Sequence, residues 1–140
     1  MTTTPESAKQ ANKVVVACLD GRRVKGFVYN FSAVRDSFTV FHFDDSHQKS
    51  AVEIGMKEAK AVFFVKDFTG NREYQDISRP DLPKHGRKIE VTFADGEKLI
   101  GSTEAYNPAK LGFFMFPIDP KSNNARIFVI RENVVQTRFL

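Results

Sequence analysis

One pattern occurs twice in this chain, and it limits the fold more than any other feature. The pair Asp20-Gly21 recurs as Asp95-Gly96, 75 positions later, and at the same offset Gly26 matches Gly101. Because turn residues and apolar positions keep one register, the sequence predicts two copies of one structural unit. From residue 13 onward, the other identical pairs at this offset are Lys13 with Lys88, Val16 with Val91, Phe38 with Phe113, Phe41 with Phe116, Asp44 with Asp119 and Phe64 with Phe139.

Each copy has the pattern of short β-strands. Ile89, Val91 and Phe93 alternate with polar or small residues, which is the period of a half-buried strand. The Asp-Gly pairs supply the positive φ angle of a tight hairpin, and Gly26, inside the next strand, indicates a sharp bend. A 3₁₀ turn is expected before the last strand of each copy. The later strands are expected near 37–43, 51–54 and 60–66, and near 111–117, 125–130 and 135–140.

These patterns predict an all-β protein with two tandem, five-stranded, strongly bent SH3-like barrels. We place the first barrel at residues 13–67 and the second at 88–140. The linker, 68–87, contains proline and glycine that break regular structure, with a short helical turn expected near 71–75. The N-terminal segment 1–12 is either a short helix, since Pro5 suits a first helical turn, or a frayed tail.

Composition narrows the environment of the protein. The formal net charge is +4, and residues 13–66 and 84–140 each carry nine basic and six acidic side chains, so nucleic-acid binding is permitted without being required. No apolar run approaches the roughly 20 residues of a membrane-spanning helix, and the N-terminus has no apolar segment typical of a secretory signal. We therefore expect a cytoplasmic protein with no membrane partner. The single cysteine, Cys18, is expected to be a small buried hydrophobe.

Three segments resemble motifs of a known family. Residues 14–26 and 89–101 share alternating apolar positions, Asp-Gly, four residues and Gly, which resembles the first motif of the Sm-like barrels, a family that includes the bacterial Hfq proteins. Residues 128–135 resemble the second motif of that family. The resemblance implies Sm-like barrels and an RNA site. Sm-like RNA binders carry Asp and Asn in the loop after the second strand, where this chain has Ser32 and Asp36, or Asn107 and Leu111. Of the residues that form the RNA site in that family, only the ones that match Asn107 and Arg131 carry over to this chain.

Two further resemblances concern shorter segments. Residues 60–67 resemble segments of uncharacterised bacterial proteins of this tandem type, which implies a bacterial source and no known activity. Residues 76–78, Asp-Ile-Ser, begin the motif by which PilZ domains bind cyclic di-GMP, but the glycine of that motif is missing. We interpret this match as coincidence and keep PilZ-like signalling as the weakest alternative.

Few residues have a pattern that indicates catalysis or a metal site. His42 and Asp44, with Asp45 and His47, could hold zinc, but the second copy repeats none of this set except Asp119, so a polar hairpin tip is the expected structure. Nucleophilic catalysis needs a nucleophile, a base and an orienting group that converge, and the three histidines suggest no such set. We expect no enzyme activity, no metal and no cofactor.

Basic and aromatic residues offer two interaction surfaces. Arg22, Arg23 and Lys25 precede Phe27 and Tyr29, a combination that can hold phosphates and stack bases, although a solvated hairpin is the competing interpretation. The second surface is aromatic: the chain has 14 Phe, and adjacent pairs on a strand point to opposite faces, so one ring of each pair must leave its own core. These rings suit a subunit interface or packing between the two copies. They are Phe63, Phe64, Phe113 and Phe114, with Phe68 nearby.

The expected function is therefore a non-enzymatic binding or adaptor protein that contacts a protein partner or a second copy of itself through its aromatic edges. The alternative is an RNA-binding regulator. Its contacts would come from Arg22, Arg23, Lys25, Asn107 and Arg131. We expect no DNA partner.

Overall fold

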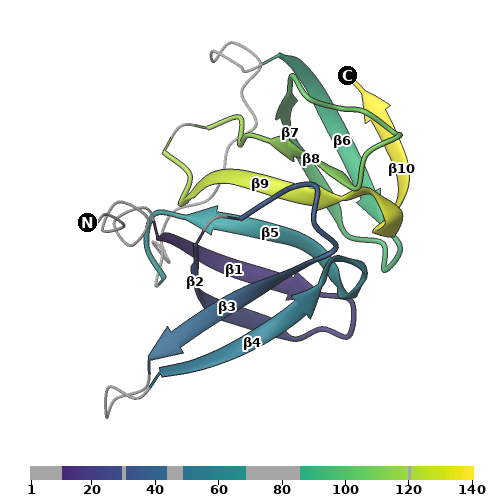
Figure 1. Cartoon of the computed structure of the whole chain (residues 1–140). Coiled ribbons are helices and arrows are strands. Elements are labelled where there is room, and N and C mark those ends of the chain that lie inside the picture. The colour runs from purple at the N-terminus through teal and green to yellow at the C-terminus, as the bar shows by residue number, and fades with distance from the viewer. Residues whose placement is uncertain (1–10, 30, 44–48, 69–85, 120) are drawn as a thin grey trace.

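The computed structural model describes residues 11–29, 31–43, 49–68, 86–119 and 121–140. Within these residues the protein is all-β, and each copy of the repeat contributes five strands (Figure 1). The first module contains β1 (Asn12–Cys18), β2 (Arg23–Val28), β3 (Ser37–Phe43), β4 (Lys49–Gly55) and β5 (Ala59–Val65). The second module contains β6 (Arg87–Phe93), β7 (Lys98–Thr103), β8 (Gly112–Met115), β9 (Asn124–Ile130) and β10 (Val134–Phe139).

Short 3₁₀ turns, η1 (Met56–Glu58) and η2 (Arg131–Asn133), precede the last strand of each module, as predicted. The predicted N-terminal helix or tail and the helical turn near 71–75 lie outside the described residues. In the part of the chain that the structure describes, no helix has the length and apolar character needed to cross a membrane.

The repeated glycines have the same structural role in both modules. Gly21 and Gly96 have φ angles of 95° and 94°, which only glycine adopts readily, and they close the Asp-Gly hairpins. A β-carbon on Gly26 would lie 2.5 Å from the carbonyl oxygen of Phe41, and one on Gly101 would meet the equivalent oxygen of Phe116. The second strand of each module can therefore cross close to the third only because a side chain is missing at this position.

The ten strands are not divided into two separate five-stranded barrels. A seven-stranded sheet has the order β4-β3-β2-β1-β5-β9-β8, and a three-stranded sheet has the order β10-β6-β7, with one bridge between Ser102 and Phe116 linking the two sheets. β5 of the first module pairs antiparallel with β9 of the second, with Val62 opposite Phe128. Because both strands are apolar at successive positions, both of their faces can be buried.

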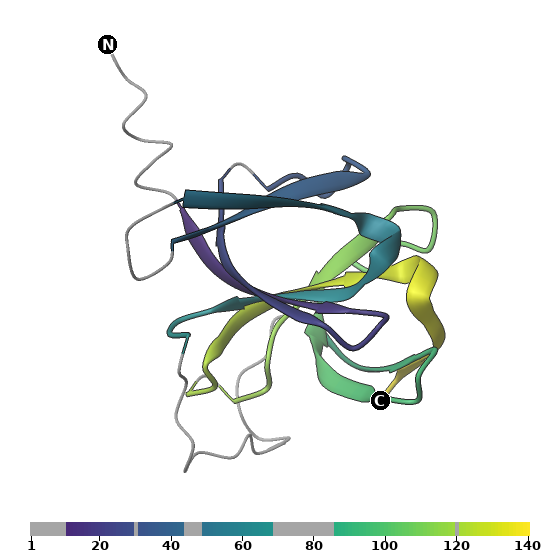
Figure 2. The same ribbon diagram turned by 90° about the horizontal axis from the view of Figure 1, so that it is seen from below.

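The β5–β9 pair separates two hydrophobic cores (Figures 1 and 2). Val62 of β5 and Phe128 of β9 belong to the first core, whereas the neighbouring Ala61 and Val129 belong to the second core. Each strand of the pair thus contributes alternate side chains to both cores. The two modules share their central strands, so neither core is complete without the other module.

Polar contacts also join the modules. The Lys60 side chain of β5 is 9% exposed, and its Nζ donates hydrogen bonds to Asp95, at 2.8 Å, and to Glu97. Burial alone would lower the pKa of Lys60, but the hydrogen bonds to the two carboxylates outweigh it and raise that pKa. From the second module, Asn133 Nδ2 donates to the carbonyl oxygen of Ala59 at 2.6 Å. These contacts fix the position of β5 against the second module.

Candidate functional site

The structure places four of the five predicted interface phenylalanines at the seam between the modules. Phe64 and Phe114 pack on the first core, and Phe63 and Phe113 pack on the second core. The guanidinium of Arg126 lies over the Phe64 ring, 4.4 Å from its centroid, and burial lowers the Arg126 pKa. Phe63 and Phe114 thus pack on the core of the other module, whereas Phe64 and Phe113 stay in the core of their own module.

The fifth predicted interface ring has a different position. Phe68 lies edge-on against Phe27 of β2, with the ring centroids 5.4 Å apart. Phe68 and Phe27 are both half-buried. This aromatic pair belongs to the outer face of the first module.

The basic residues predicted for RNA contact lie in two separate groups. Arg23 and Lys25 are exposed on β2 and, two positions apart, point to the same face as Phe27. Arg22 is held by Asp20, whose carboxylate accepts from Arg22 Nε at 2.8 Å. The Arg22 backbone N–H and side chain lower the pKa of Asp20. The first group therefore has two basic side chains without a carboxylate partner among the described residues.

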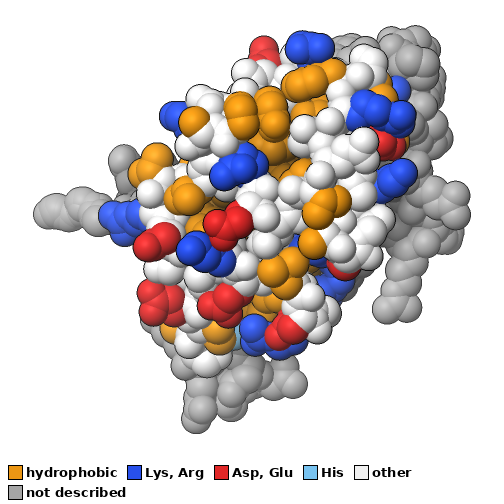
Figure 3. All heavy atoms as spheres, turned by 90° about the vertical axis from the view of Figure 1, so that its right-hand side faces the viewer, with side chains coloured by type: hydrophobic (Ala, Val, Ile, Leu, Met, Phe, Trp, Pro, Cys, Tyr) orange, Lys and Arg blue, Asp and Glu red, His pale blue; other side chains and the backbone are white. Residues whose placement is uncertain are grey.

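The second group belongs to the second module. Asn107 Oδ1 accepts from the backbone N–H of Ala109 at 2.9 Å, and Arg131 Nε donates to the carbonyl oxygen of Lys110 at 3.1 Å. Both residues are thus engaged in holding the loop before β8. On the face that bears β10, Lys and Arg side chains alternate with Asp, Glu and hydrophobic groups (Figure 3). The basic charge is not gathered there.

The other candidates from the sequence have ordinary structural positions. His42 Nδ1 lies 3.0 Å from the carbonyl oxygen of Lys25, and its companions Asp44, Asp45 and His47 fall outside the described residues. Cys18 is buried, and burial raises the pKa of its thiol. The PilZ-like segment 76–78 also lies outside the described residues. Among the residues that are described, no three His, Cys, Asp or Glu side chains are grouped to hold a metal ion.

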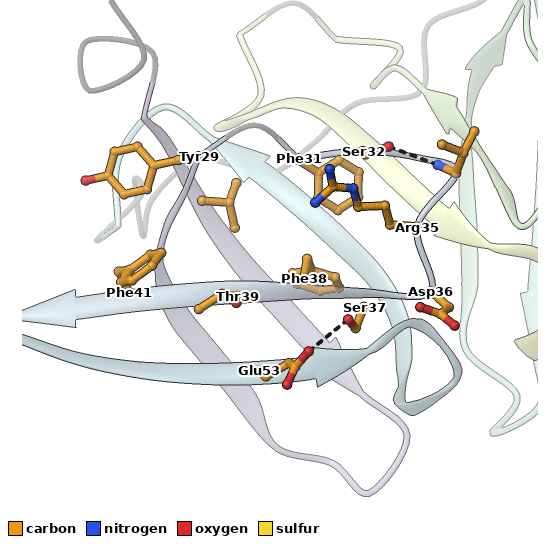
Figure 4. Close-up of a pocket in the computed structure, with 12 residues that line it drawn as sticks. Tyr29, Phe31, Ser32, Arg35, Asp36, Ser37, Phe38, Thr39, Phe41 and Glu53 are labelled. Carbon is orange, nitrogen blue, oxygen red and sulfur yellow. Dashed lines mark hydrogen bonds between the residues drawn. The ribbon is translucent and has the colours of Figure 1, made fainter. Parts of the chain in front are cut away.

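A cleft of about 690 Å³ lies between β3 and the loop that follows β2 (Figure 4). Its base is aromatic: Phe31 packs on Phe38 with the ring centroids 5.4 Å apart, and Tyr29 packs on Phe41 at 5.5 Å. A cavity of this size is in the range of small-ligand and peptide sites. We call it the loop cleft, and it is lined by Val28, Tyr29, Phe31, Ser32, Val34, Arg35, Asp36, Ser37, Phe38, Thr39, Phe41 and Glu53.

Charged and exposed side chains form the rim of the loop cleft. Val34 is 77% exposed, and Arg35 and Asp36 are also exposed. Glu53 accepts a hydrogen bond from Ser37 Oγ at 3.0 Å. The Arg35 side chain lines the cleft and makes no side-chain hydrogen bond or ion pair with another described residue (Figure 4). The cleft thus combines an aromatic base with one unpaired cation.

The second module has a smaller cleft of about 420 Å³ at the equivalent place, where Tyr106 packs on Phe113 and Lys110 takes the position of Arg35. The two clefts differ at Tyr29 and Glu53, which are replaced by Glu104 and by Phe128, a residue buried in the first core. Sequence reasoning named Tyr29 as a neighbour of the basic residues and Ser32 and Asp36 as loop positions, but it missed Phe31, Arg35 and Glu53. The two copies share an aromatic residue and a basic residue at the first two of these positions, where the second copy has Tyr106 and Lys110, and they differ at the third, where Phe128 replaces Glu53. That comparison does not show that the loop surrounds a cavity.

Comparisons with known proteins add one finding. A family model described as a family of unknown function, DUF6982, matches residues 10–140. No curated protein and no solved structure matches the chain.

Proposed function

Since the chain belongs to the DUF6982 family, a family of unknown function, we propose its role from its own structure: a non-enzymatic binding module that takes up a protein partner in the loop cleft. The observation that carries this proposal is the loop cleft with Arg35 on its rim and the Tyr29–Phe41 ring pair in its base, a pair that the second module lacks because Glu104 replaces Tyr29. Features shared by both modules build the fold. A feature of one module alone is the better candidate for function.

The chemistry of the loop cleft supports binding rather than catalysis. Its one hydroxyl–carboxylate pair is Ser37 with Glu53, and no histidine is among the residues that line it. Nucleophilic catalysis at a serine needs a base and a group that orients the base. Aromatic rings, by contrast, supply large contact areas at protein interfaces, and an arginine beside them is typical of interface centres.

The partner is proposed to be a different protein rather than a second copy bound by strand pairing. β4 and β10 are the outer strands of the two sheets, and a second copy could repeat the β5–β9 junction only by pairing its β4 with β10. Polar side chains at the facing positions make this unfavourable, since burying charged side chains is costly. At the equivalent positions, Gln136 replaces Ala61, Arg138 replaces Phe63 and Glu53 replaces Phe128.

We also propose that each module is a bent five-stranded unit of the Sm-like type. The support is the close crossing at Gly26 and Gly101 and the 3₁₀ turn before β5 and before β10. The pairing of β5 with β9 then joins two such units into one body.

The binding function is tested with a photo-reactive amino acid at Val34, on the rim of the loop cleft, in cells that express the protein. We expect a reproducible cross-link to one protein, and binding of that purified protein should weaken in the Arg35→Glu variant. The same amino acid at Leu111, which is 42% exposed in the second module, is the control. Equal cross-links from Leu111, or cross-links to nucleic acid alone, would contradict the proposal.

A second candidate function is RNA binding, which the exposed Arg23 and Lys25 beside Phe27 favour. Single-stranded RNA bound by phosphate contacts shows a salt dependence of about 0.7 in log-log slope for each contact. We expect the double variant Arg23→Ala and Lys25→Ala to reduce that slope by about 1.4 if this candidate is right. Undetectable binding of labelled RNA at low salt would exclude it.

A further inference from the structure

β3 has an open edge inside the loop cleft. β2 pairs with β3 only at Phe27 and Phe41, whereas β3 pairs with β4 along its whole length. On the side that faces β2, residues 37–40 therefore have no strand partner within the described chain. An unpaired strand edge presents backbone N–H and C=O groups that an added strand can bond.

The second module shows which backbone groups face the loop cleft. There Ser102 and Phe116 are equivalent to Phe27 and Phe41. The backbone N–H of Ser102 donates to the carbonyl oxygen of Phe116 at 2.9 Å, and the N–H of Phe116 donates to the carbonyl oxygen of Ser102 at 2.8 Å. Because backbone groups along a strand alternate between its two sides, those of the residue two positions earlier point the same way. In the first module that residue is Thr39, so its N–H and C=O face the cleft.

In the second module the equivalent carbonyl already has a donor. Thr103 Oγ1 donates to the carbonyl oxygen of Phe114 at 2.7 Å. The first module has Val28 and Thr39 at these two positions, and valine has no hydroxyl to donate. The same backbone site that is closed by a side chain in one module is open toward a cavity in the other.

The side chains of the loop cleft indicate the chemistry of a ligand. Tyr29, Phe31 and Phe41 offer aromatic surface for an apolar side chain. Glu53 is hydrogen-bonded by Ser37, and the Asp36 carboxylate points away from the Arg35 guanidinium (Figure 4). Arg35 is the one cation among the residues that line the cleft, and an acidic side chain placed at its guanidinium complements it.

From these contacts we infer that the loop cleft binds an extended peptide segment of the partner, added as a short strand along Thr39 of β3. An acidic side chain of the segment lies beside Arg35, and an apolar side chain on the same face lies against the aromatic base. The inference rests on the proposed binding function and specifies its ligand class.

The test begins with a displayed library of random nonapeptides selected on the full chain. We expect the selected peptides to carry Asp or Glu two positions from an aromatic or branched residue, because side chains of a strand share a face at that spacing. A labelled synthetic peptide from this set is then measured by fluorescence anisotropy. Arg35→Glu should weaken its binding by about tenfold or more, and changing the acidic residue of the peptide to lysine should restore binding to that variant.

Backbone methylation of the peptide separates strand addition from docking of side chains alone. Methylating successive amide nitrogens one at a time should weaken binding by about tenfold or more at alternate positions only, since alternate amides face β3. The control variant is Lys98→Glu, which makes the same charge reversal at an exposed position of β7 in the second module, and it should leave binding unchanged.

The possible results distinguish the inference from the proposed function. If peptides bind the loop cleft with no alternation on methylation, or bind equally well to Arg35→Glu, the inference of an acidic extended segment is overturned while a binding function remains. If the library yields no binder and the cross-link from Val34 is also absent, both are overturned.

Discussion

Phe128 offers a direct test of whether the two modules fold as one unit. The residue lies on β9 of the second module, but its ring is 0% exposed and packs in the first core. Its centroid lies 5.2 Å from that of Phe31 and 5.0 Å from that of Phe114. Phe128→Ala leaves a cavity among these rings, and truncation of a buried phenylalanine lowers the free energy of unfolding by about 3 to 5 kcal/mol.

The loss can be measured as a shift in melting temperature. For a chain of this length, each kcal/mol corresponds to about 3 to 4 °C, so we expect the melting temperature to fall by about 10 to 20 °C in differential scanning calorimetry. Because the β5–β9 pair closes both cores, the variant should still melt in one transition. Hydrogen exchange measured by mass spectrometry should speed up in peptides from both modules.

Phe41→Ala is the matched control, since Phe41 is half-buried on the wall of the loop cleft. The same truncation there should cost about 1 kcal/mol or less. Two separate melting transitions, of which Phe128→Ala moves only one, would refute the shared core. A loss below about 1 kcal/mol for Phe128→Ala would refute the packing argument itself.

Three further outcomes are expected. The hydrogen bond from Lys60 lowers the pKa of Asp95. This pair therefore stabilises the fold at pH values above the ordinary Asp pKa of about 3.9, and the stabilisation is lost as the pH falls through the lowered pKa. Urea unfolding from pH 7 to pH 2 should show a smaller loss of stability in Asp95→Asn than in the wild type. Gly26→Ala should destabilise by about 1 to 3 kcal/mol in urea, because its β-carbon meets backbone. Wild-type protein should be monomeric in sedimentation velocity, and the double variant Gln136→Ala and Arg138→Phe should associate.

Sequence reasoning located the strands because their signals are local. The alternation at Ile89, Val91 and Phe93 and the positive φ at Gly21 depend on neighbours within a few residues. The 75-residue offset added a second, independent copy of each signal. The existence of ten strands and two 3₁₀ turns could therefore be predicted from the chain alone.

The pairing between modules could not be predicted in this way. The adjacent rings Phe63 and Phe64 indicated that one of them leaves its own core, but they did not indicate which strand covers it. That choice depends on β9, more than 55 residues away, having apolar side chains on both faces. Strand pairing over such a distance is decided by the fit of whole surfaces and not by local pattern.

The candidate site was harder still to predict. Phe31 and Arg35 belong to the loop between β2 and β3, whereas Glu53 belongs to β4. No spacing rule in the sequence connects the three residues. Their meeting depends on β2 and β3 separating after a single pair, which leaves a cavity under the loop.

By itself, the sequence determined that the chain is all-β and built of two copies, because turn chemistry and side-chain period are properties of short segments. Only the tertiary structure decided that β5 joins β9, so that two repeats share one seven-stranded sheet and two interlocked cores. Likewise, only the tertiary structure left the edge of β3 open in the first module while Thr103 closes it in the second. The physical reason is that burial of a strand face and the bonding of its backbone are settled by whichever surface packs against it.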